Sequence, residues 1–210
     1  MKSIFIVLLS AFCAVNTLGQ AAKKSTTKKI ISEPKREVKI RTTDVTTVTD
    51  EEYKIYLAVL GKDREMFVVR DKTGIDDTAK NYKKSIIREA LRELSDETYD
   101  DFKVKAEKQA SLEKKFPTRN NYTLISLDEL KKSFAYVFDD DINWDKFYQE
   151  HPKSRGIYTF SRVGFNRQGS QALVFVTNWC RSLCGEGNFY LLEKENEEWK
   201  VVENRMIWIS

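Results

Sequence analysis

The spacing of apolar residues changes at Gly156, and this change constrains the fold more than any other feature of the sequence. Before Gly156, apolar residues recur mostly every three or four positions, as they do on one face of a helix. After it come short runs rich in Val, Ile, Phe, Tyr and Trp, separated by turn residues, which is typical of β-strands. The sequence therefore predicts an α+β fold, in which N-terminal helices pack on a C-terminal antiparallel meander sheet of four to five strands. The runs are residues 157–166, 171–178, 188–194, 199–202 and 206–209.

The second of these runs is expected at the centre of the sheet. Residues 172–176 read Ala-Leu-Val-Phe-Val and are apolar at every position. Because successive side chains of a strand point to opposite faces, both faces of this strand need a cover. The helices of the first half are expected to supply one of them.

Two capping boxes mark helix starts in the N-terminal half. Thr49 is followed by Glu52, and Ser126 by Glu129, at the spacing where each side chain bonds the backbone amide of the other. Apolar residues at helical spacing follow both boxes, so a helix is predicted after each. The remaining predicted elements are amphipathic helices over 78–94 and 95–116 and short strands over 66–69 and 122–125.

Residues 139–150 partly match a calcium-binding loop. Asp or Asn stands at the first three ligand positions and Glu150 at the twelfth, but Trp144 occupies the sixth, where the sharp turn requires Gly. We therefore interpret the run as the acidic approach to a helix that carries Trp144, Phe147 and Tyr148. Since the chain has one His and 3 Cys, neither a metal site nor a cofactor is predicted.

The first nineteen residues have the composition of a signal peptide. Lys2 gives a positive start, and residues 4–15 form an apolar run that is shorter than the roughly 20 residues a membrane-spanning helix needs. Small residues precede a cut after Gly19, with a cut after Ala21 as the second choice. We therefore expect residues 1–19 to be removed and the protein to be periplasmic or extracellular, with no transmembrane segment after cleavage. A lipid anchor on Cys13 is the alternative, which the large residue before it disfavours.

A basic linker is predicted over residues 20–43. Eight basic and two acidic residues give it a charge of +6, and because Lys2 adds +1 to a formal net charge of +4, residues 44–210 carry −3. The linker has too few apolar residues to offset its ordering entropy, so we expect a flexible segment ahead of a single domain over 44–210. The alternative is a tether to anionic lipid or polysaccharide. Nucleic acid is not an expected partner, because no aromatic residue is interleaved with the lysines to stack on bases.

Removal of the signal peptide leaves two cysteines, Cys180 and Cys184. An even count at short spacing in an oxidising compartment predicts a disulfide between them. A redox-active dithiol is the alternative, and the absence of Cys-x-x-Cys spacing disfavours it.

Five strings near the C-terminus carry a resemblance to other proteins. They are Ser-Arg-Val-Gly-Phe-Asn at 161–166, Ala-Leu-Val-Phe-Val at 172–176, Cys-x-x-x-Cys-Gly-x-Gly from 180, Trp-Lys-Val-Val from 199 and Trp-Ile-Ser at 208–210. Together they resemble a group of uncharacterised exported bacterial proteins, most closely over roughly the last sixty residues. The resemblance implies export and a shared fold, without an activity. More distantly, the arrangement of helices on a sheet is similar to the cystatin-like and nuclear-transport-factor-like folds, which implies no function.

Arg162 is the strongest candidate for a binding residue. A guanidinium in the middle of a strand, within an apolar layer, must meet a carboxylate, backbone carbonyls or a pocket open to water. An ion pair is the favoured expectation. The alternative is that Arg162 lines a cavity, because Gly164, two residues further on the same face, leaves room beside it.

Two classes of function are compatible with these features. The favoured one is a binding or interaction module for an unknown small molecule or envelope protein. The alternative is an envelope enzyme that uses Arg162 with an acid such as Glu186. No catalytic residue is assigned, because Ser161 lacks the Gly-x-Ser-x-Gly setting of a nucleophile elbow. The predicted ligand-binding residues are Tyr158, Arg162, Trp179, Arg181, Glu186 and Trp208.

Export predicts a processed N-terminus. N-terminal sequencing of the protein from its native host should begin at Gln20 or Ala22, because cleavage is expected after Gly19 or Ala21. Intact Met1 in protein from the cytoplasmic fraction would contradict the prediction.

Overall fold

The computed structural model describes residues 47–61, 66–118, 121–136, 139–181 and 183–210. The predicted signal peptide (1–19), the predicted linker (20–43) and residues 44–46 lie outside the described residues. No helix in the described ranges has both the length and the apolar character that a membrane crossing requires. The helices are α1 (Asp50–Leu60), α2 (Asp77–Lys80), α3 (Lys84–Ala90), α4 (Asp96–Ala106), α5 (Leu127–Phe134) and α6 (Trp144–Glu150). The strands are β1 (Met66–Arg70), β2 (Asn121–Ile125), β3 (Ala135–Tyr136), β4 (Asp139–Ile142), β5 (Ile157–Phe160), β6 (Gly164–Phe165), β7 (Gln171–Trp179), β8 (Glu186–Glu195) and β9 (Glu198–Ile209).

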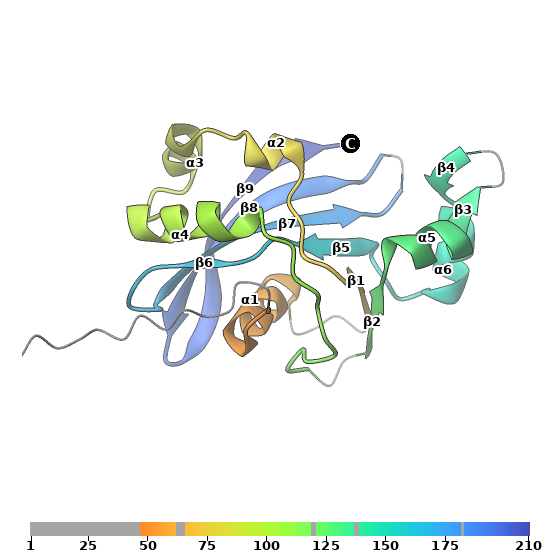
Figure 1. The fold of residues 1–210 in the computed structure, drawn as a ribbon, viewed down its shortest axis with the longest axis horizontal. Coiled ribbons are helices and arrows are strands. Elements are labelled where there is room, and N and C mark those ends of the chain that lie inside the picture. The colour runs from red at the N-terminus through yellow and green to blue at the C-terminus, as the bar shows by residue number, and fades with distance from the viewer. Residues whose placement is uncertain (1–46, 62–65, 119–120, 137–138, 182) are drawn as a thin grey trace, which may run out of the picture. The chain divides into compact units, whose positions relative to one another are not determined.

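The main sheet of the described residues is mixed. It has seven strands in the order β2-β1-β5-β7-β8-β9, with β6 also paired to β7, and β3 and β4 form a separate pair. Neighbours from β5 to β9 run antiparallel, as predicted for the C-terminal half. Strand β1, however, runs parallel to both β2 and β5 (Figure 1). The predicted α+β class is therefore confirmed. The prediction of a purely antiparallel sheet with four to five strands was wrong, because the sheet is mixed and has seven strands.

Strands β1 and β2, which were not expected in this sheet, join it because β1 is apolar on both faces. Phe67, Val68 and Val69 are all buried, and a strand of this kind needs neighbours on both sides and covers on both faces. Two further boundaries differ from the prediction. The run 157–166 is divided between β5 and β6, whereas 199–202 and 206–209 are parts of the single strand β9.

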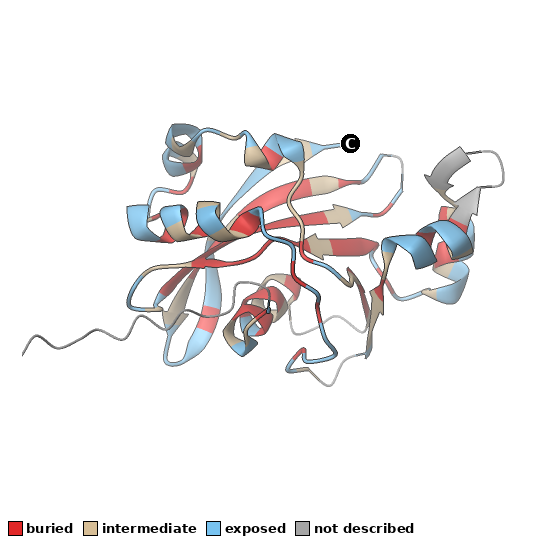
Figure 2. Cartoon of the chain, viewed as in Figure 1, coloured by how far each residue is buried: buried red, intermediate tan, exposed pale blue. Residues whose placement is uncertain are grey.

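The predicted central strand is central. Strand β7 lies between β5 and β8, and seven consecutive residues from Gln171 to Thr177 are buried. Alternate side chains reach opposite faces: Val174 packs in a cluster with α1, and Phe175 in a cluster with α3 and α4. The helices therefore cover both faces, as the buried strands in Figure 2 show.

Three clusters of buried apolar side chains hold the helices to the sheet. The first cluster lies under α1, the second under α2, α3 and α4, and the third under α5 and α6. Each fully buried large apolar side chain stabilises the fold by roughly 1.5 to 3 kcal/mol. The clusters include Tyr56, Phe160 and Val174 in the first, Phe102, Phe175 and Phe189 in the second, and Phe134, Phe147 and Ile157 in the third.

Gly164 is the point where α4 meets the sheet. A Cβ atom at Gly164 would lie 2.3 Å from the backbone nitrogen of Phe102, which is too close for any side chain. The sequence-based reason for a cavity beside Arg162 was therefore wrong. The space next to Gly164 is filled by the backbone of α4, and the glycine permits this close approach.

His151, the only histidine of the chain, packs in the third cluster. Its ring centroid lies 4.9 Å from that of Phe147 and 6.0 Å from that of Phe134. The Nδ1 atom is buried and has no hydrogen-bond partner among the described residues. Burial lowers the pKa of His151, and the charge of Glu150 only partly opposes this effect.

The lowered pKa predicts that acid destabilises the fold. The unfolded chain takes up a proton near pH 6.5, whereas folded His151 resists it, so the free energy of unfolding should fall as the pH drops below about 6.5. Urea midpoints measured between pH 7.5 and 5.5 would check this. His151→Phe keeps a ring between Phe134 and Phe147 without a titrating group, so its midpoint should change less over this interval. An equal change in both proteins would contradict the prediction.

Candidate functional site

Arg162 forms a buried ion pair with Glu52 of α1. Its Nε donates to Oε1 of Glu52 at 2.8 Å, and its Nη2 donates to Oε2 at 3.0 Å. Arg162 is 2% exposed and Glu52 1% exposed. Nη2 also donates to the backbone oxygen of Thr47 at 2.9 Å. The favoured sequence expectation, an ion pair, is the arrangement found.

The capping box at the start of α1 positions this carboxylate. The amide of Thr49 donates to Oε2 of Glu52 at 2.9 Å, and the amide of Glu52 donates to Oγ1 of Thr49 at 3.3 Å. The amide of Val163 donates to Oε1 of Glu52 at 3.1 Å. The carboxylate thus accepts hydrogen bonds both from its own helix start and from the segment between β5 and β6. One turn further along α1, Tyr56 donates its hydroxyl to the backbone oxygen of Ser161 at 2.9 Å.

The electrostatics of the pair favour the charged state. Burial acts to lower the pKa of Arg162, but the hydrogen bonds and the negative charge of Glu52 outweigh it, so the pKa of Arg162 is raised. A guanidinium held in this way is a structural cation. A cavity of about 310 Å³ lies beside the pair, and Arg162 and Glu52 themselves are among its lining residues. The alternative expectation, that Arg162 lines a cavity, is therefore met as well, although Arg162 is 2% exposed and its guanidinium is bonded to Glu52.

Glu51 bonds residues near the turn that joins β8 to β9. It accepts hydrogen bonds from Nε1 of Trp199 at 2.7 Å and from Lys54 at 2.9 Å, and it pairs with Lys194 at 2.9 Å. Burial alone would raise the pKa of Glu51, but the bonds from Lys194, Lys54 and Trp199 lower it to about 2. Glu51 is therefore ionised at neutral pH and serves the docking of α1.

A second group of predicted site residues gathers at the end of the sheet where β7 ends and β8 begins. The rings of Trp179 and Trp208 lie with their centroids 5.3 Å apart. Trp179 is 46% exposed, whereas Trp208 is half-buried and donates its Nε1 hydrogen to Oδ2 of Asp76 at 2.9 Å. Asp76 also caps α2, so this bond joins the end of β9 to a helix start.

Gly187 leaves the space that the indole ring of Trp208 fills, because a Cβ atom there would lie 2.4 Å from Nε1 of Trp208. A Cβ atom at Gly185 would lie 2.6 Å from Oγ of Ser210, so this glycine permits the close approach of Ser210. The Gly-x-Gly string after Cys184 therefore serves the packing of Trp208 and Ser210. This role of the glycines was not predicted, because spacing along the chain does not show which side chain will pack against a glycine.

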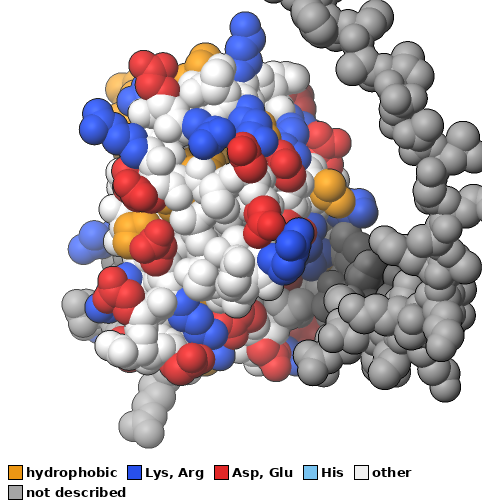
Figure 3. Space-filling view, turned by 90° about the vertical axis from the view of Figure 1, so that its left-hand side faces the viewer, with side chains coloured by type: hydrophobic (Ala, Val, Ile, Leu, Met, Phe, Trp, Pro, Cys, Tyr) orange, Lys and Arg blue, Asp and Glu red, His pale blue; other side chains and the backbone are white. Residues whose placement is uncertain are grey.

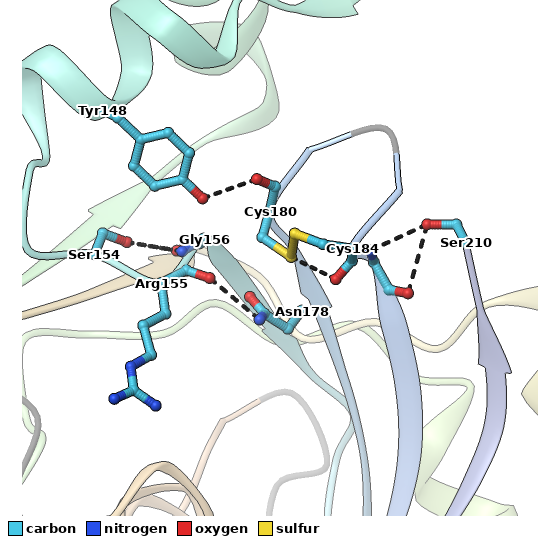
Figure 4. The surroundings of a disulfide bond; sticks show 9 residues. Tyr148, Ser154, Arg155, Gly156, Asn178, Cys180, Cys184 and Ser210 are labelled. Carbon is cyan, nitrogen blue, oxygen red and sulfur yellow. Dashed lines mark hydrogen bonds between the residues drawn. A yellow bond between two sulfur atoms is a disulfide. The ribbon is translucent and has the colours of Figure 1, made fainter.

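A disulfide closes the loop between β7 and β8. Cys180 and Cys184 are bonded, which confirms the prediction. Figure 4 shows how the loop is held from two sides: Tyr148 of α6 donates its hydroxyl to the backbone oxygen of Cys180 at 2.9 Å, and Ser210 bonds Gly185. The two ends of the loop are thus held by α6, by Ser210 and by the covalent bond.

Large apolar side chains are exposed around this loop. Leu183, inside the disulfide loop, is 85% exposed, and Ile209, next to the C-terminal residue, is 69% exposed. We call the surface formed by Trp179, Leu183 and Trp208 the tryptophan end; Ile209 follows Trp208 in β9, so its side chain points to the opposite face of the sheet. Leu183 was missed as a site residue, although an apolar residue between two cysteines was a signal that could have identified it.

The six predicted ligand-binding residues fall into separate places. Trp179 and Trp208 lie together at the tryptophan end. Arg181 lies in the same loop and pairs with Asp145 at 2.9 Å. Glu186 lies at the start of β8, opposite Asn178 near the end of β7. Ser161, by contrast, donates its backbone amide to the oxygen of Phe175, further back along β7. Arg162 follows Ser161 and bonds Glu52, so it does not form a site with Glu186. Tyr158 is 7% exposed and packs in the first cluster.

The described residues contain no group of three or more His, Cys, Asp or Glu side chains placed to hold a metal ion. Asn143, which the partial calcium-loop match included, caps α6 by accepting from the amide of Lys146 at 3.1 Å. The helix with Trp144, Phe147 and Tyr148 is present as predicted. Comparisons with family models, curated proteins and solved structures found no match to this chain.

Replacement of Arg162 should destabilise the fold. Arg162→Lys keeps the charge but loses the planar fork that bonds both oxygens of Glu52, so it should cost a clear part of the about 3 to 5 kcal/mol that removal of one partner from a buried pair costs. Chemical denaturation would measure the loss. Arg167→Lys is the matched control, because Arg167 pairs with Glu97 on the surface and its side chain is 85% exposed, so its substitution should have little effect. An unchanged midpoint in Arg162→Lys would contradict the structural assignment.

Proposed function

We propose that this protein is an exported binding module that holds a partner protein of the cell envelope through the tryptophan end. The observation that carries the proposal is the exposure of large apolar side chains there: Trp179 is 46% and Leu183 85% exposed. A cluster of such side chains on a protein surface marks an interaction site. Tryptophan is the residue type most enriched among those that dominate binding energy.

The tryptophan end is also held by several contacts, which favours binding. The disulfide joins the two ends of the loop, Gly187 makes room for the indole of Trp208, and Asp76 holds Trp208 by a hydrogen bond. A surface that is ordered before binding loses less entropy when a partner binds. Arg181 and its partner Asp145, at the side of the loop, supply the polar rim that surrounds the apolar centre of many interfaces.

The opposite side of the domain has a different character. The face in Figure 3 carries acidic and basic side chains interspersed with a few apolar ones, as on an ordinary solvated surface. Of the two surfaces, the tryptophan end thus has the composition of an interaction site.

The compartment is part of the proposal. A disulfide in a surface loop persists in oxidising compartments, which supports the predicted export. The partner is therefore expected in the periplasm or at the cell surface.

The alternative, an envelope enzyme that uses Arg162, has less support. The guanidinium of Arg162 is turned to Glu52 and Thr47, and both charged residues of the pair are almost fully buried. A catalytic cation would have to reach a substrate, and Glu186 lies at the start of β8, opposite Asn178 of β7.

Site-specific photo-crosslinking in the native host tests the proposal. A benzophenone amino acid placed at position 183 should give one discrete protein adduct, because Leu183 is exposed and its replacement costs the fold little. Trp179→Ala in the same background should reduce the adduct by at least about tenfold, as expected when a central tryptophan is removed. The matched control carries the photo-crosslinker at Lys131, which is exposed on α5 and should give no such adduct.

An adduct that persists in Trp179→Ala, or equal labelling from both positions, would refute the tryptophan end as the binding surface. Absence of any adduct from position 183 would refute the proposed envelope protein partner.

A further inference from the structure

Strand β9 is a long edge of the main sheet. It spans Glu198–Ile209, and among the described residues it is paired on one side only, with β8. Its outer side therefore presents backbone amides and carbonyls without strand partners, and such an edge is a template for another strand. Val202 and Met206 on this strand are 40% and 45% exposed.

Two irregularities limit which part of the edge can pair. The register with β8 shifts once between Val201 and Glu203 and again between Met206 and Trp208. Two longer stretches of β9 keep a regular ladder, 198–201 next to the turn from β8 and 203–206 between the two shifts, and bulges of this kind normally prevent pairing over the full length of an edge. We consider 203–206 as the centre of an added strand, because it lies away from the turn.

We propose that β9 pairs antiparallel with β9 of a second copy of this chain, with the two-fold axis at Asn204. An axis that brings two identical strands side by side in one continuous sheet is perpendicular to the sheet, so every side chain stays on its own face. Directly opposed residues share a face, and therefore the residue on the axis opposes itself. Residues equally far before and after it then oppose each other.

Within the segment 203–206, Asn204 is the axis position at which the sequence is complementary to itself. Glu203 opposes Arg205 of the second copy, and Arg205 opposes its Glu203, so the pairing forms two ion pairs. The exposed Val202 opposes Met206 of the second copy. Opposite charges and apolar pairs directly across two strands both stabilise a sheet.

Neighbouring axis positions lose this match. An axis at Glu203 would place Val202 against Asn204 and Val201 against Arg205. An axis at Arg205 would place Asn204 against Met206. Neither arrangement pairs opposite charges.

The faces of the charged residues fit the same pairing. Glu203 opposes Leu191 in β8 and Arg205 opposes Phe189, and both of these apolar residues belong to the second cluster. Glu203 and Arg205 therefore point to the same face of the sheet. Glu203 accepts a hydrogen bond from the backbone amide of Glu93 at 3.4 Å, which leaves its carboxylate further lone pairs for a cation. The side chain of Arg205 is exposed and forms no hydrogen bond or ion pair within the described part of the chain, so its guanidinium is available to a second copy.

The pairing segment is short, so the dimer is expected to depend on concentration. Few residues lie between the bulges, and the contact is smaller than the standard interface of about 800 Å² per partner. Sedimentation of the full chain from about 5 to 500 µM should show a monomer that gives way to a dimer.

Charge reversal tests the register. Glu203→Arg and Arg205→Glu each place like charges opposite each other twice per dimer, and each should weaken dimerisation by about tenfold or more. A mixture of the two variants should form heterodimers, because the first carries two basic residues at positions 203 and 205 and the second two acidic ones, so both ion pairs are restored between unlike chains. Trp179→Ala should leave dimerisation unchanged, so failure of the proposed function is distinguishable from failure of this pairing.

A cysteine pair gives an independent readout. Asn204→Cys should cross-link two copies under mild oxidation, since position 204 opposes itself. Lys200→Cys is the matched control on the same exposed strand: its two copies would lie eight residues apart along the pairing, about 26 Å, and should not cross-link.

A chain that stays monomeric to 500 µM would overturn the proposal. So would a dimer that the charge reversals leave intact, variants whose mixture fails to associate, or equal cross-linking at positions 200 and 204.

Discussion

The buried pair of Glu52 and Arg162 is the interaction on which the position of α1 depends. The same carboxylate closes the capping box with Thr49, bonds the amide of Val163 and neutralises the guanidinium. Removal of either charged side chain would leave the other charge buried alone, which is why such a pair is either complete or strongly destabilising. Because α1 covers the first cluster, the contacts of Tyr56 with Phe160 and the burial of Val174 all follow from this docking.

This interaction also shows how far the sequence could predict the fold. The capping box at Thr49 and the need of Arg162 for a partner are both visible locally, and both expectations were correct. The identity of the partner was not predictable, because Glu52 and Arg162 are 110 positions apart and the chain offers many acids. Gly164 illustrates the same limit. A glycine indicates that something lies close, but only the fold shows that it is the backbone of α4 and not a cavity. The parallel pairing of β1 was missed for a similar reason, since a short apolar run carries no information on strand direction.

The candidate site was predicted in part. Trp179 and Trp208 were grouped from composition and position, and the register of β7, β8 and β9 does bring their rings together. Arg162 and Tyr158 were grouped with them as residues of the open face or mouth of the predicted sheet, yet Tyr158 is buried under α1 and Arg162 faces Glu52. Strand membership predicts a shared sheet, whereas the face and the end of the sheet at which a side chain lies are set by register.

The two edges of the sheet are managed in different ways. On one side, β1 and β2 extend the meander beyond β5, so the outermost strand there is β2, with only five residues. On the other side the edge is β9, with 12 residues, and it is the two bulges and the charged residues between them that interrupt it. Charges on an edge strand usually oppose association, because a neighbouring strand would have to bury them unpaired. Glu203 and Arg205 stand symmetrically about Asn204, as an acid and a base. These charges disfavour any partner strand except one that presents a base and an acid in the reverse order. An antiparallel copy of the chain presents that order.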